Sequence, residues 1–129
     1  MTQRIQAWLG SFEGLGLPTV DALAPEEGWG LFPQGERILR RTTDILGNTR
    51  LRRQVSYKLK LHRKKDSRGD DPGIQPLLER LSRWVTRDAP VFGRDQTVRA
   101  ENARLTAQNR EDMARYEVLL VFEFEEAET

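Results

Sequence analysis

The stretch RRQVSYKLKLHRKK, residues 52–65, decides the fold because apolar and polar side chains alternate along most of it. Successive side chains of a β-strand point to opposite faces, so this pattern separates apolar groups from polar ones. The apolar face holds Val55, Tyr57, Leu59 and Leu61, and the polar face holds Ser56, Lys58, Lys60 and His62. We therefore expect a strand that packs on the core and turns a basic face toward solvent or a partner.

The segment before this stretch completes a hairpin. Residues 37–43 and 49–63 both have strand character, and Gly47 and Asn48 between them are typical turn residues. Further upstream, residues 19–23 are predicted to form a short strand. A loop follows, and we expect its large apolar side chains to pack on the core; they are Trp29, Leu31 and Phe32.

Two helices are predicted to cover the sheet. Near the start of the chain, apolar residues recur at helical spacing over residues 5–12, and Thr2 is expected to cap the first turn. A longer apolar stripe over residues 74–85 predicts the main core helix. Asp71 is the expected N-cap of this helix, and Pro72 suits its first position.

The last part of the chain predicts two more strands. Residues 96–108 alternate weakly and are mostly polar, which is typical of an exposed or edge strand. Residues 109–113 are expected to form a turn. Residues 114–125 are the most apolar run and carry apolar groups on both faces for part of their length. Such a strand is expected to be central or half covered by a neighbouring subunit.

The predicted architecture is α+β, with an antiparallel sheet of about four to five strands packed against two helices. One domain is expected over residues 1–129, with a flexible loop at about 63–71 and an acidic tail at about 125–129. The residues expected to form the core are Trp8, Tyr57, Leu59, Leu77, Leu81, Trp84, Tyr116, Val118, Leu120 and Phe122.

The charge of the chain is nearly balanced in total but unevenly distributed. The net charge is +1, yet residues 36–65 hold eleven Lys or Arg against only Glu36 and Asp44. Residues 117–129 hold five Glu and no base. A chain with a basic middle and an acidic end can pair with copies of itself as readily as it can bind a polyanion.

The sequence offers little catalytic chemistry, so we expect a protein that is not an enzyme and holds no metal or cofactor. There is no cysteine, which excludes disulfides and thiolate chemistry, and His62 is the only histidine. A zinc site of the usual kinds cannot be assembled from these residues, and no nucleophile or phosphate-binding motif accompanies His62. The adhesion-like tripeptide at residues 68–70 is interpreted as a chance match in a polar loop. No apolar run approaches the roughly 18 residues of a membrane-spanning helix.

The basic hairpin, residues 36–65, also permits a nucleic-acid-binding module. Its cations are numerous enough for a phosphate footprint. Against this, the aromatic residues that stack on single-stranded bases are sparse, because only Tyr57 lies in the hairpin and it is predicted on the core face. Nucleic-acid binding stays the alternative to a surface that meets another protein subunit.

In its element order the chain resembles the tail terminators, the small tail-completion proteins of tailed bacteriophages and prophages. The segments that carry the resemblance are RIQAWLGSF, PTVDAL, RRQVSYKLKLHRK, IQPLLERLSRWV and ARYEVLLVFEFEE. Together they span nearly the whole chain. They match a pattern of helix, strand, hairpin, helix and hairpin that ends in an alternating strand after a tyrosine. The long basic stretch at residues 36–65 departs from this pattern.

The resemblance implies structural work in the virion tail, by a protein made in the bacterial host cytoplasm. Such proteins are monomeric or weakly associated in solution and form a hexameric ring on the last ring of the tail tube. The ring stops tube polymerisation and meets the head-completion or neck protein. In contractile tails the ring also meets the sheath protein, and DNA passes through the lumen as cargo without base-specific recognition. No membrane is involved.

A ring built by head-to-tail contacts needs two different, complementary patches on each subunit. We hypothesise that the basic hairpin and the acidic C-terminal strand are such a pair. The residues expected at subunit or tube interfaces are Arg40, Arg41, Arg50, Arg52, Arg53, Lys58, Lys60, Glu117, Glu123 and Glu125.

Overall fold

The computed structural model describes residues 1–23, 27–66, 68, 71–108 and 113–128, and has an α+β fold. Its elements in chain order are α1 (Thr2–Gly10), β1 (Thr19–Val20), β2 (Gly28–Thr43), β3 (Thr49–Lys64), α2 (Ile74–Trp84), β4 (Arg94–Gln108) and β5 (Met113–Ala127). The strands form one sheet in the order β1-β2-β3-β5-β4. The predicted turn at residues 109–113 lies outside the described residues except for Met113, and so do the last two residues of the adhesion-like tripeptide.

The sheet is mixed, which corrects the expectation of a purely antiparallel one. β1 pairs with β2 in parallel through two residue pairs, Thr19 with Gly30 and Val20 with Leu31. All other neighbours are antiparallel. β5 lies between β3 and β4, so the most apolar strand is central, as its two-sided apolar pattern predicts.

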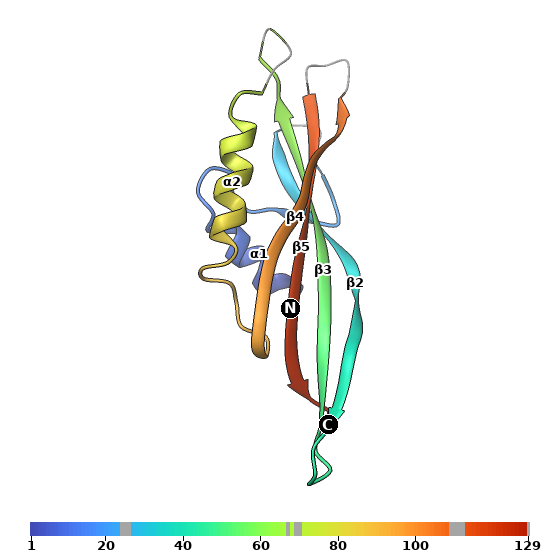
Figure 1. Ribbon diagram of the computed structural model, residues 1–129. Helices are drawn as coiled ribbons and strands as arrows, with labels where there is room; N and C mark the ends of the chain where they lie inside the picture. Colours follow the sequence, from blue (N-terminus) through green and yellow to red (C-terminus); the bar gives the residue numbers. More distant parts are fainter. Residues whose placement is uncertain (24–26, 67, 69–70, 109–112, 129) are drawn as a thin grey trace.

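Both helices lie on the same face of the sheet, and the other face is left without a covering layer (Figure 1). The core fills the space between the helices and this face. Side chains from β3 and β5 alternate into it, because partners in the β3–β5 register, such as Leu59 and Val118, share a face. Most of the predicted core residues are buried: Tyr57, Leu59, Leu77, Leu81, Tyr116, Val118, Leu120 and Phe122.

The two remaining predicted core residues, Trp8 and Trp84, are partly buried and join the helices to each other. Their rings stack with centroids 4.7 Å apart, and Trp8 also meets Phe122 edge-on at 6.0 Å. Aromatic pairs of this kind add about 0.5–1.5 kcal/mol beyond the area that they bury. The tryptophans therefore tie α1 to α2 and both helices to β5.

The start of each helix differs from the sequence-based expectation. Thr2 is the first residue of α1 and not its cap, and a hydrogen bond of 3.1 Å joins its hydroxyl to that of Tyr57. α2 begins at Ile74 after Gly73, so Asp71 is not its side-chain cap. The Asp71 carboxylate instead binds Arg63 at the end of β3. In both places a tertiary partner competes with local capping and takes the polar side chain.

β2 begins at Gly28, nine residues before the predicted position, so the expected loop is the first part of this strand. Trp29 and Leu31 are buried on the core, and Phe32 is half-buried. β1 is shorter than predicted, because the backbone at Asp21 turns into the left-handed region with φ 57°. β5 continues to Ala127, so most of the expected acidic tail belongs to a strand.

The helices cover only part of the length of the sheet. Below them in Figure 1, β2, β3 and the end of β5 continue without a helix on either face, and the β2–β3 turn forms the tip. We call residues 36–54 and 123–128 the uncovered end. Every residue of β2 in this region is exposed. Leu51 and Phe124 are the buried apolar side chains described in this region, so most of its stability must come from cross-strand contacts.

Candidate interaction surfaces

No catalytic constellation appears among the residues that the structure describes. His62 shares the uncovered face with Arg115, and Arg115 Nε donates a hydrogen bond of 3.3 Å to His62 Nε2. Across the described ranges no three His, Cys, Asp or Glu side chains gather as metal ligands would. The candidate sites described below are surfaces, defined by their charged and apolar side chains.

On the uncovered face, the basic side of β3 lies directly beside the acidic side of β5. Glu117 lies opposite Lys60 in the register, and its carboxylate is 4.0 Å from Lys60 Nζ and 3.9 Å from Lys58 Nζ. Glu123 is 3.7 Å from Arg99 Nη1 and accepts a hydrogen bond of 2.8 Å from Gln54. Opposite charges in cross-strand positions stabilise a sheet, typically by a few tenths of a kcal/mol each.

The same compensation occurs at the uncovered end. Arg53 joins two carboxylates, with Nη1 2.7 Å from Glu36 and Nη2 2.6 Å from Glu126. Arg40 lies 3.1 Å from Glu125, and Arg41 lies 3.0 Å from Glu128. Strands that are exposed on both faces need charge to stay soluble, and these pairs supply it without a large excess of one sign.

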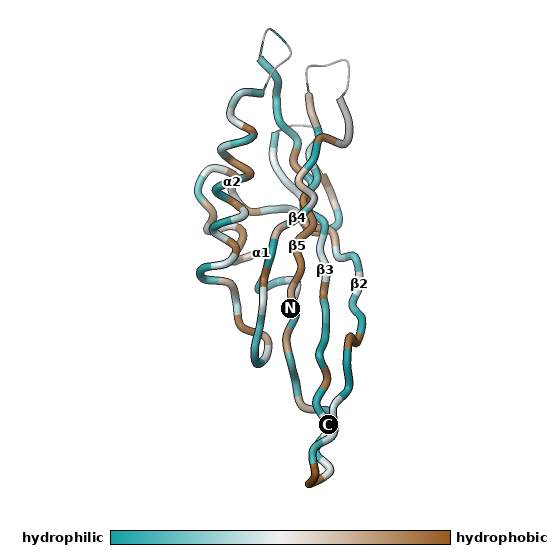
Figure 2. Tube along the Cα trace, viewed as in Figure 1, coloured by the Kyte–Doolittle hydropathy of each residue, from teal (hydrophilic) through white to brown (hydrophobic). Residues whose placement is uncertain are grey.

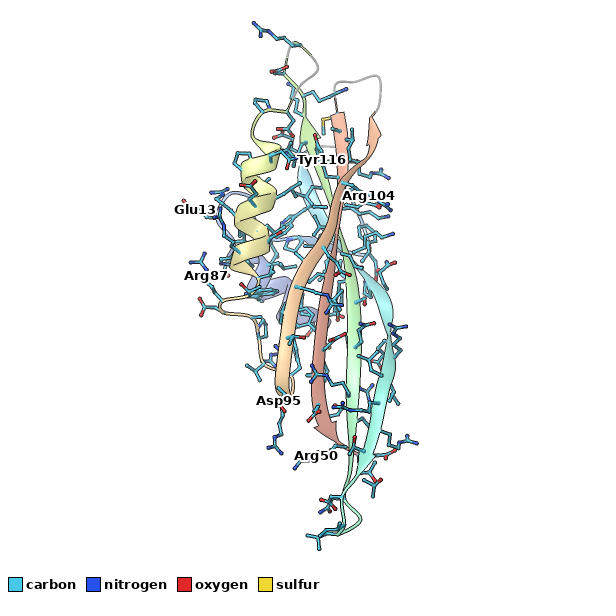
Figure 3. The ribbon with its side chains drawn as sticks, viewed as in Figure 1. Glu13, Arg50, Arg87, Asp95, Arg104 and Tyr116 are labelled. Atoms are coloured by element: carbon cyan, nitrogen blue, oxygen red, sulfur yellow. The ribbon has the colours of Figure 1, made fainter. Side chains whose placement is uncertain are left out.

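Most of the charges predicted to face another subunit thus find partners within their own chain. This holds for Arg40, Arg41, Arg53, Lys58, Lys60, Glu117, Glu123 and Glu125. Arg52 donates to the main-chain oxygen of Asp95 at 2.9 Å and so ties β3 to the start of β4. Arg50 is exposed near the turn (Figure 3). The complementarity that the sequence shows between its middle and its end is therefore present within a single chain.

The best-formed ion pair joins Arg63 to Asp71. Arg63 Nε and Nη2 donate to the two carboxylate oxygens at 2.6 Å and 3.0 Å, and the Asp71 side chain is only 4% exposed. This hydrogen bond raises the pKa of Arg63, against the opposing effect of burial. The two-pronged geometry fixes the chain just before α2 relative to the end of β3.

The tip of the β2–β3 hairpin presents an apolar surface with no cover. Ile45 and Leu46 are 102% and 82% exposed, and they form the hydrophobic end of the tube in Figure 2. We call these two residues the apolar tip. The Asp44 side chain organises the turn beneath it, accepting from the backbone N–H groups of Leu46 and Asn48, each at 2.9 Å. These bonds, chiefly that from Asn48, hold the pKa of Asp44 below its ordinary value of 3.8.

The apolar tip is the feature that sequence reasoning missed, although a signal for it was present. The five residues DILGN, 44–48, contain good turn residues at both ends and two large aliphatic residues in the middle. The centre of a tight hairpin turn projects into solvent, where polar residues are usual. An aliphatic pair at that position is unusual, which makes the turn a candidate contact surface.

Comparison of the chain with models of known protein families and with curated protein sequences finds no match. Neither helix in the described part of the chain combines the length and apolar character that crossing a bilayer requires. The functional interpretation thus depends on the sequence pattern and on the surfaces described above.

Proposed function

We propose that this chain is a structural subunit of an assembled particle, a tail terminator of a tailed bacteriophage or prophage or a closely related head–tail joining protein. In this role it forms a ring on the end of the tail tube, ends tube polymerisation and offers a surface to the head-completion or neck protein. The sheath protein is a further neighbour in contractile tails. The resemblance in element order supports this assignment, and the α+β architecture is compatible with it.

The observation that carries the proposal is the apolar tip at the end of the uncovered strands. Burial of an aliphatic side chain is worth about 1.5–3 kcal/mol, and neither Ile45 nor Leu46 gains this within the chain. The Asp44 hydrogen bonds hold the turn in one shape before any partner arrives, which lowers the entropy cost of docking. An extended hairpin with a hydrogen-bonded turn and an apolar end is suited to assembly.

A ring requires a second patch that receives the first. A hollow of about 410 Å³ between α2 and β4 is a suitable receptor, and it is lined mostly by apolar surface. Its lining residues are Gln75, Leu78, Glu79, Ser82, Arg83 and Ala103. We propose that the apolar tip of one copy enters this hollow on the next copy, which gives a head-to-tail contact that can close by rotation.

The alternative, nucleic-acid binding, is less favoured because many of the cations that would contact phosphates already have carboxylate partners in the folded chain. Counting only carboxylates of the described residues, at least six of the eleven cations in residues 36–65 lie within 4.0 Å of one: Arg40, Arg41, Arg53, Lys58, Lys60 and Arg63. A phosphate would have to displace these partners, and less counterion release would then drive the binding. Duplex DNA passing through the ring needs no such contacts.

The test is the absolute mass of the purified protein by light scattering across concentration, with and without duplex DNA. The proposal expects the mass to rise from 14.9 kDa toward about six chains, and to do so without DNA. A chain that stays at 14.9 kDa and binds DNA, with an affinity that collapses between roughly 50 and 200 mM salt, would instead be a nucleic-acid module.

The receptor hollow has its own test. Ala103 is exposed in β4 at the edge of the hollow, so Ala103→Arg should block entry of the apolar tip without disturbing the core. We expect this variant to remain at the mass of one chain at concentrations where the wild type associates. Val91→Arg is the matched control, because Val91 is 68% exposed and does not line the hollow. Equal association of all three proteins would contradict the proposed receptor.

A further inference from the structure

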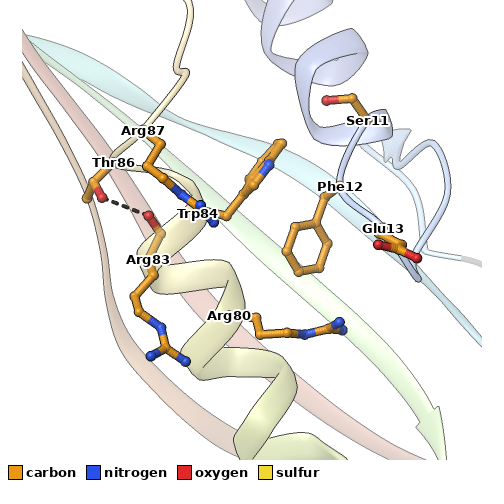
Figure 4. Close-up of a pocket in the computed structure, with 8 residues that line it drawn as sticks. All are labelled: Ser11, Phe12, Glu13, Arg80, Arg83, Trp84, Thr86 and Arg87. Carbon is orange, nitrogen blue, oxygen red and sulfur yellow. Dashed lines mark hydrogen bonds between the residues drawn. The ribbon is translucent and has the colours of Figure 1, made fainter.

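A second hollow, of about 780 Å³, lies between the end of α1 and the last turns of α2 (Figure 4). It belongs to the helical layer, so it is separate from the apolar tip and the basic strand. Its lining residues are Ser11, Phe12, Glu13, Arg80, Arg83, Trp84, Thr86 and Arg87. The volume is in the range that holds a small molecule or a few residues of a peptide.

The wall of this hollow is aromatic and held in place. Trp84 stacks on Trp8, and Phe12 meets Trp84 edge-on with centroids 5.1 Å apart. The hydroxyl groups of Ser11 and Thr86 donate to main-chain oxygens of their own turns, at 2.5 Å and 2.7 Å. These side chains are fixed by packing within the chain, so the wall does not need to reorganise when a ligand binds.

Three arginines around this wall have no carboxylate partner among the described residues. Arg80, Arg83 and Arg87 are exposed, and none of them is within 4.0 Å of a carboxylate among the residues that the structure describes. Arg80 extends across the hollow, with its guanidinium carbon 5.6 Å from the centroid of Phe12. Arg83 lies in the last turn of α2, where a cation is favourable, and Arg80 gains its contact with Phe12. Arg87 has no such partner among the described residues, and all three guanidinium groups remain available for hydrogen bonds to an anion.

The contrast with the sheet is direct. Several strand arginines, such as Arg53, have carboxylates from their own chain, whereas those around the α1–α2 hollow have none among the described residues. A guanidinium without a partner beside an aromatic wall is suited to a carboxylate that carries apolar neighbours. Arg83 also lines the hollow between α2 and β4, so Arg80 and Arg87 are the two cations that belong to this site alone.

The carboxylate of Glu13 favours an acidic peptide over a continuous polyanion as the ligand of this hollow. It lies in the lining of the hollow, and Figure 4 shows it beyond Phe12, on the side away from Arg87. A carboxylate there repels phosphates and carboxylates alike, so it disfavours a ligand with continuous negative charge, whereas a peptide can place an N–H group beside it. We propose that the α1–α2 hollow binds an acidic peptide segment of a partner protein. Arg80 and Arg87 bind the carboxylates of the peptide. Phe12 and Trp84 pack on an apolar side chain that lies between those carboxylates.

The partner is a different protein and not a second copy of this chain. The acidic end of this chain is already engaged, with Glu126 on Arg53 and Glu128 on Arg41. This inference does not depend on ring formation, since it concerns a site that a single chain possesses.

The test is fluorescence anisotropy of the full chain with a short labelled peptide of alternating glutamate and leucine. A peptide with glutamine in place of glutamate is the ligand control. Arg80→Glu with Arg87→Glu should weaken binding of the acidic peptide about tenfold or more. Arg94→Glu with Arg104→Glu makes the same change of net charge on two exposed arginines of β4 and should leave the affinity unchanged. Arg80→Lys with Arg87→Lys, which keeps the charge and the fold, should give an intermediate loss.

The proposal fails if the glutamine peptide binds as well as the acidic one, or if the β4 control loses as much affinity as the α2 variant. It also fails if duplex DNA at the same salt displaces the acidic peptide more effectively than unlabelled peptide does, because the site would then prefer phosphate. Retention of the wild-type affinity in the Arg80→Glu, Arg87→Glu protein, with its unfolding midpoint unchanged, would likewise overturn it.

Discussion

The covered half of the sheet and the uncovered end are built from the same strands but are stabilised in different ways. Where the helices lie on β3 and β5, alternate side chains such as Leu59 and Leu120 are fully buried. Toward the turn, the same strands carry charges on both faces that pair with one another. The stability of the fold therefore explains both of these patterns. It does not explain the apolar tip, whose side chains are neither buried nor paired within the chain.

The largest effect should come from a matched pair of Leu→Ala substitutions. Leu81 is fully buried in α2, so its truncation should lower the free energy of unfolding by about 2–5 kcal/mol. Leu46 is 82% exposed, and its truncation should change that free energy by no more than about 0.5 kcal/mol. Urea denaturation of both variants measures the difference. If Leu46→Ala costs as much as Leu81→Ala, the apolar tip is part of the fold.

A smaller effect is expected at the junction between the sheet and α2. Asp71→Asn removes the charge from a carboxylate that accepts two hydrogen bonds from Arg63. Hydrogen bonds to charged groups are worth about 1.5–3 kcal/mol, so the free energy of unfolding should fall by about that amount. Asp88→Asn on an exposed residue is the control and should have little effect. Equal stability of the two variants would show that the ion pair does not hold this junction.

The ion pairs of the uncovered face should contribute less. Glu117→Gln leaves Lys58 and Lys60 without their carboxylate, at distances of 3.9 Å and 4.0 Å in the wild type. The expected loss is at most about 1 kcal/mol, because the pairs are partly exposed and long. Urea denaturation at low and high salt checks this, since screening should shrink the difference. A loss that is large and independent of salt would indicate packing and not charge.

The smallest effect is local and depends on pH. The pKa of Asp44 is lowered by hydrogen bonds to its carboxylate, mainly from Asn48, so the turn gains stability from the charged form. This contribution is complete above the ordinary pKa of 3.8 and is lost as the pH falls through the lower pKa of the folded turn. The amide signals of Leu46 and Asn48 in NMR spectra should therefore titrate with a midpoint below 3.8. A midpoint at or above that value would contradict the hydrogen-bonded turn.

The strongly periodic elements were predictable from the sequence, because the repeat of buried and exposed side chains lies within each element. The alternation along residues 55–61 identified the core face of β3, and the stripe over residues 74–85 identified α2. The start of β2 was not predictable, because Pro33 and the surrounding glycines are typical of a loop. In the structure Pro33 lies in β2 just beyond the residues that pair with β1, next to an irregularity in the register between β2 and β3.

The candidate surfaces could not be predicted from the sequence, because they depend on the register between strands that are distant in the chain. Glu117 and Lys60 lie far apart in the sequence, and only the β3–β5 pairing brings their carboxylate and ammonium groups together. Without that register, a basic segment and an acidic one predict a contact between subunits as readily as one within a chain. The unpaired state of Arg80 and Arg87 is equally invisible in the sequence, because it depends on which carboxylates the fold leaves out of reach.

The role of the apolar tip in assembly is tested most directly by one measurement. The absolute mass of the Ile45→Ser, Leu46→Ser double variant is determined by light scattering beside the wild type, at matched concentrations and with matched unfolding midpoints. We predict that the wild type associates while the variant remains at 14.9 kDa with its stability unchanged. The same mass for both proteins at every concentration would contradict the role of the apolar tip in assembly.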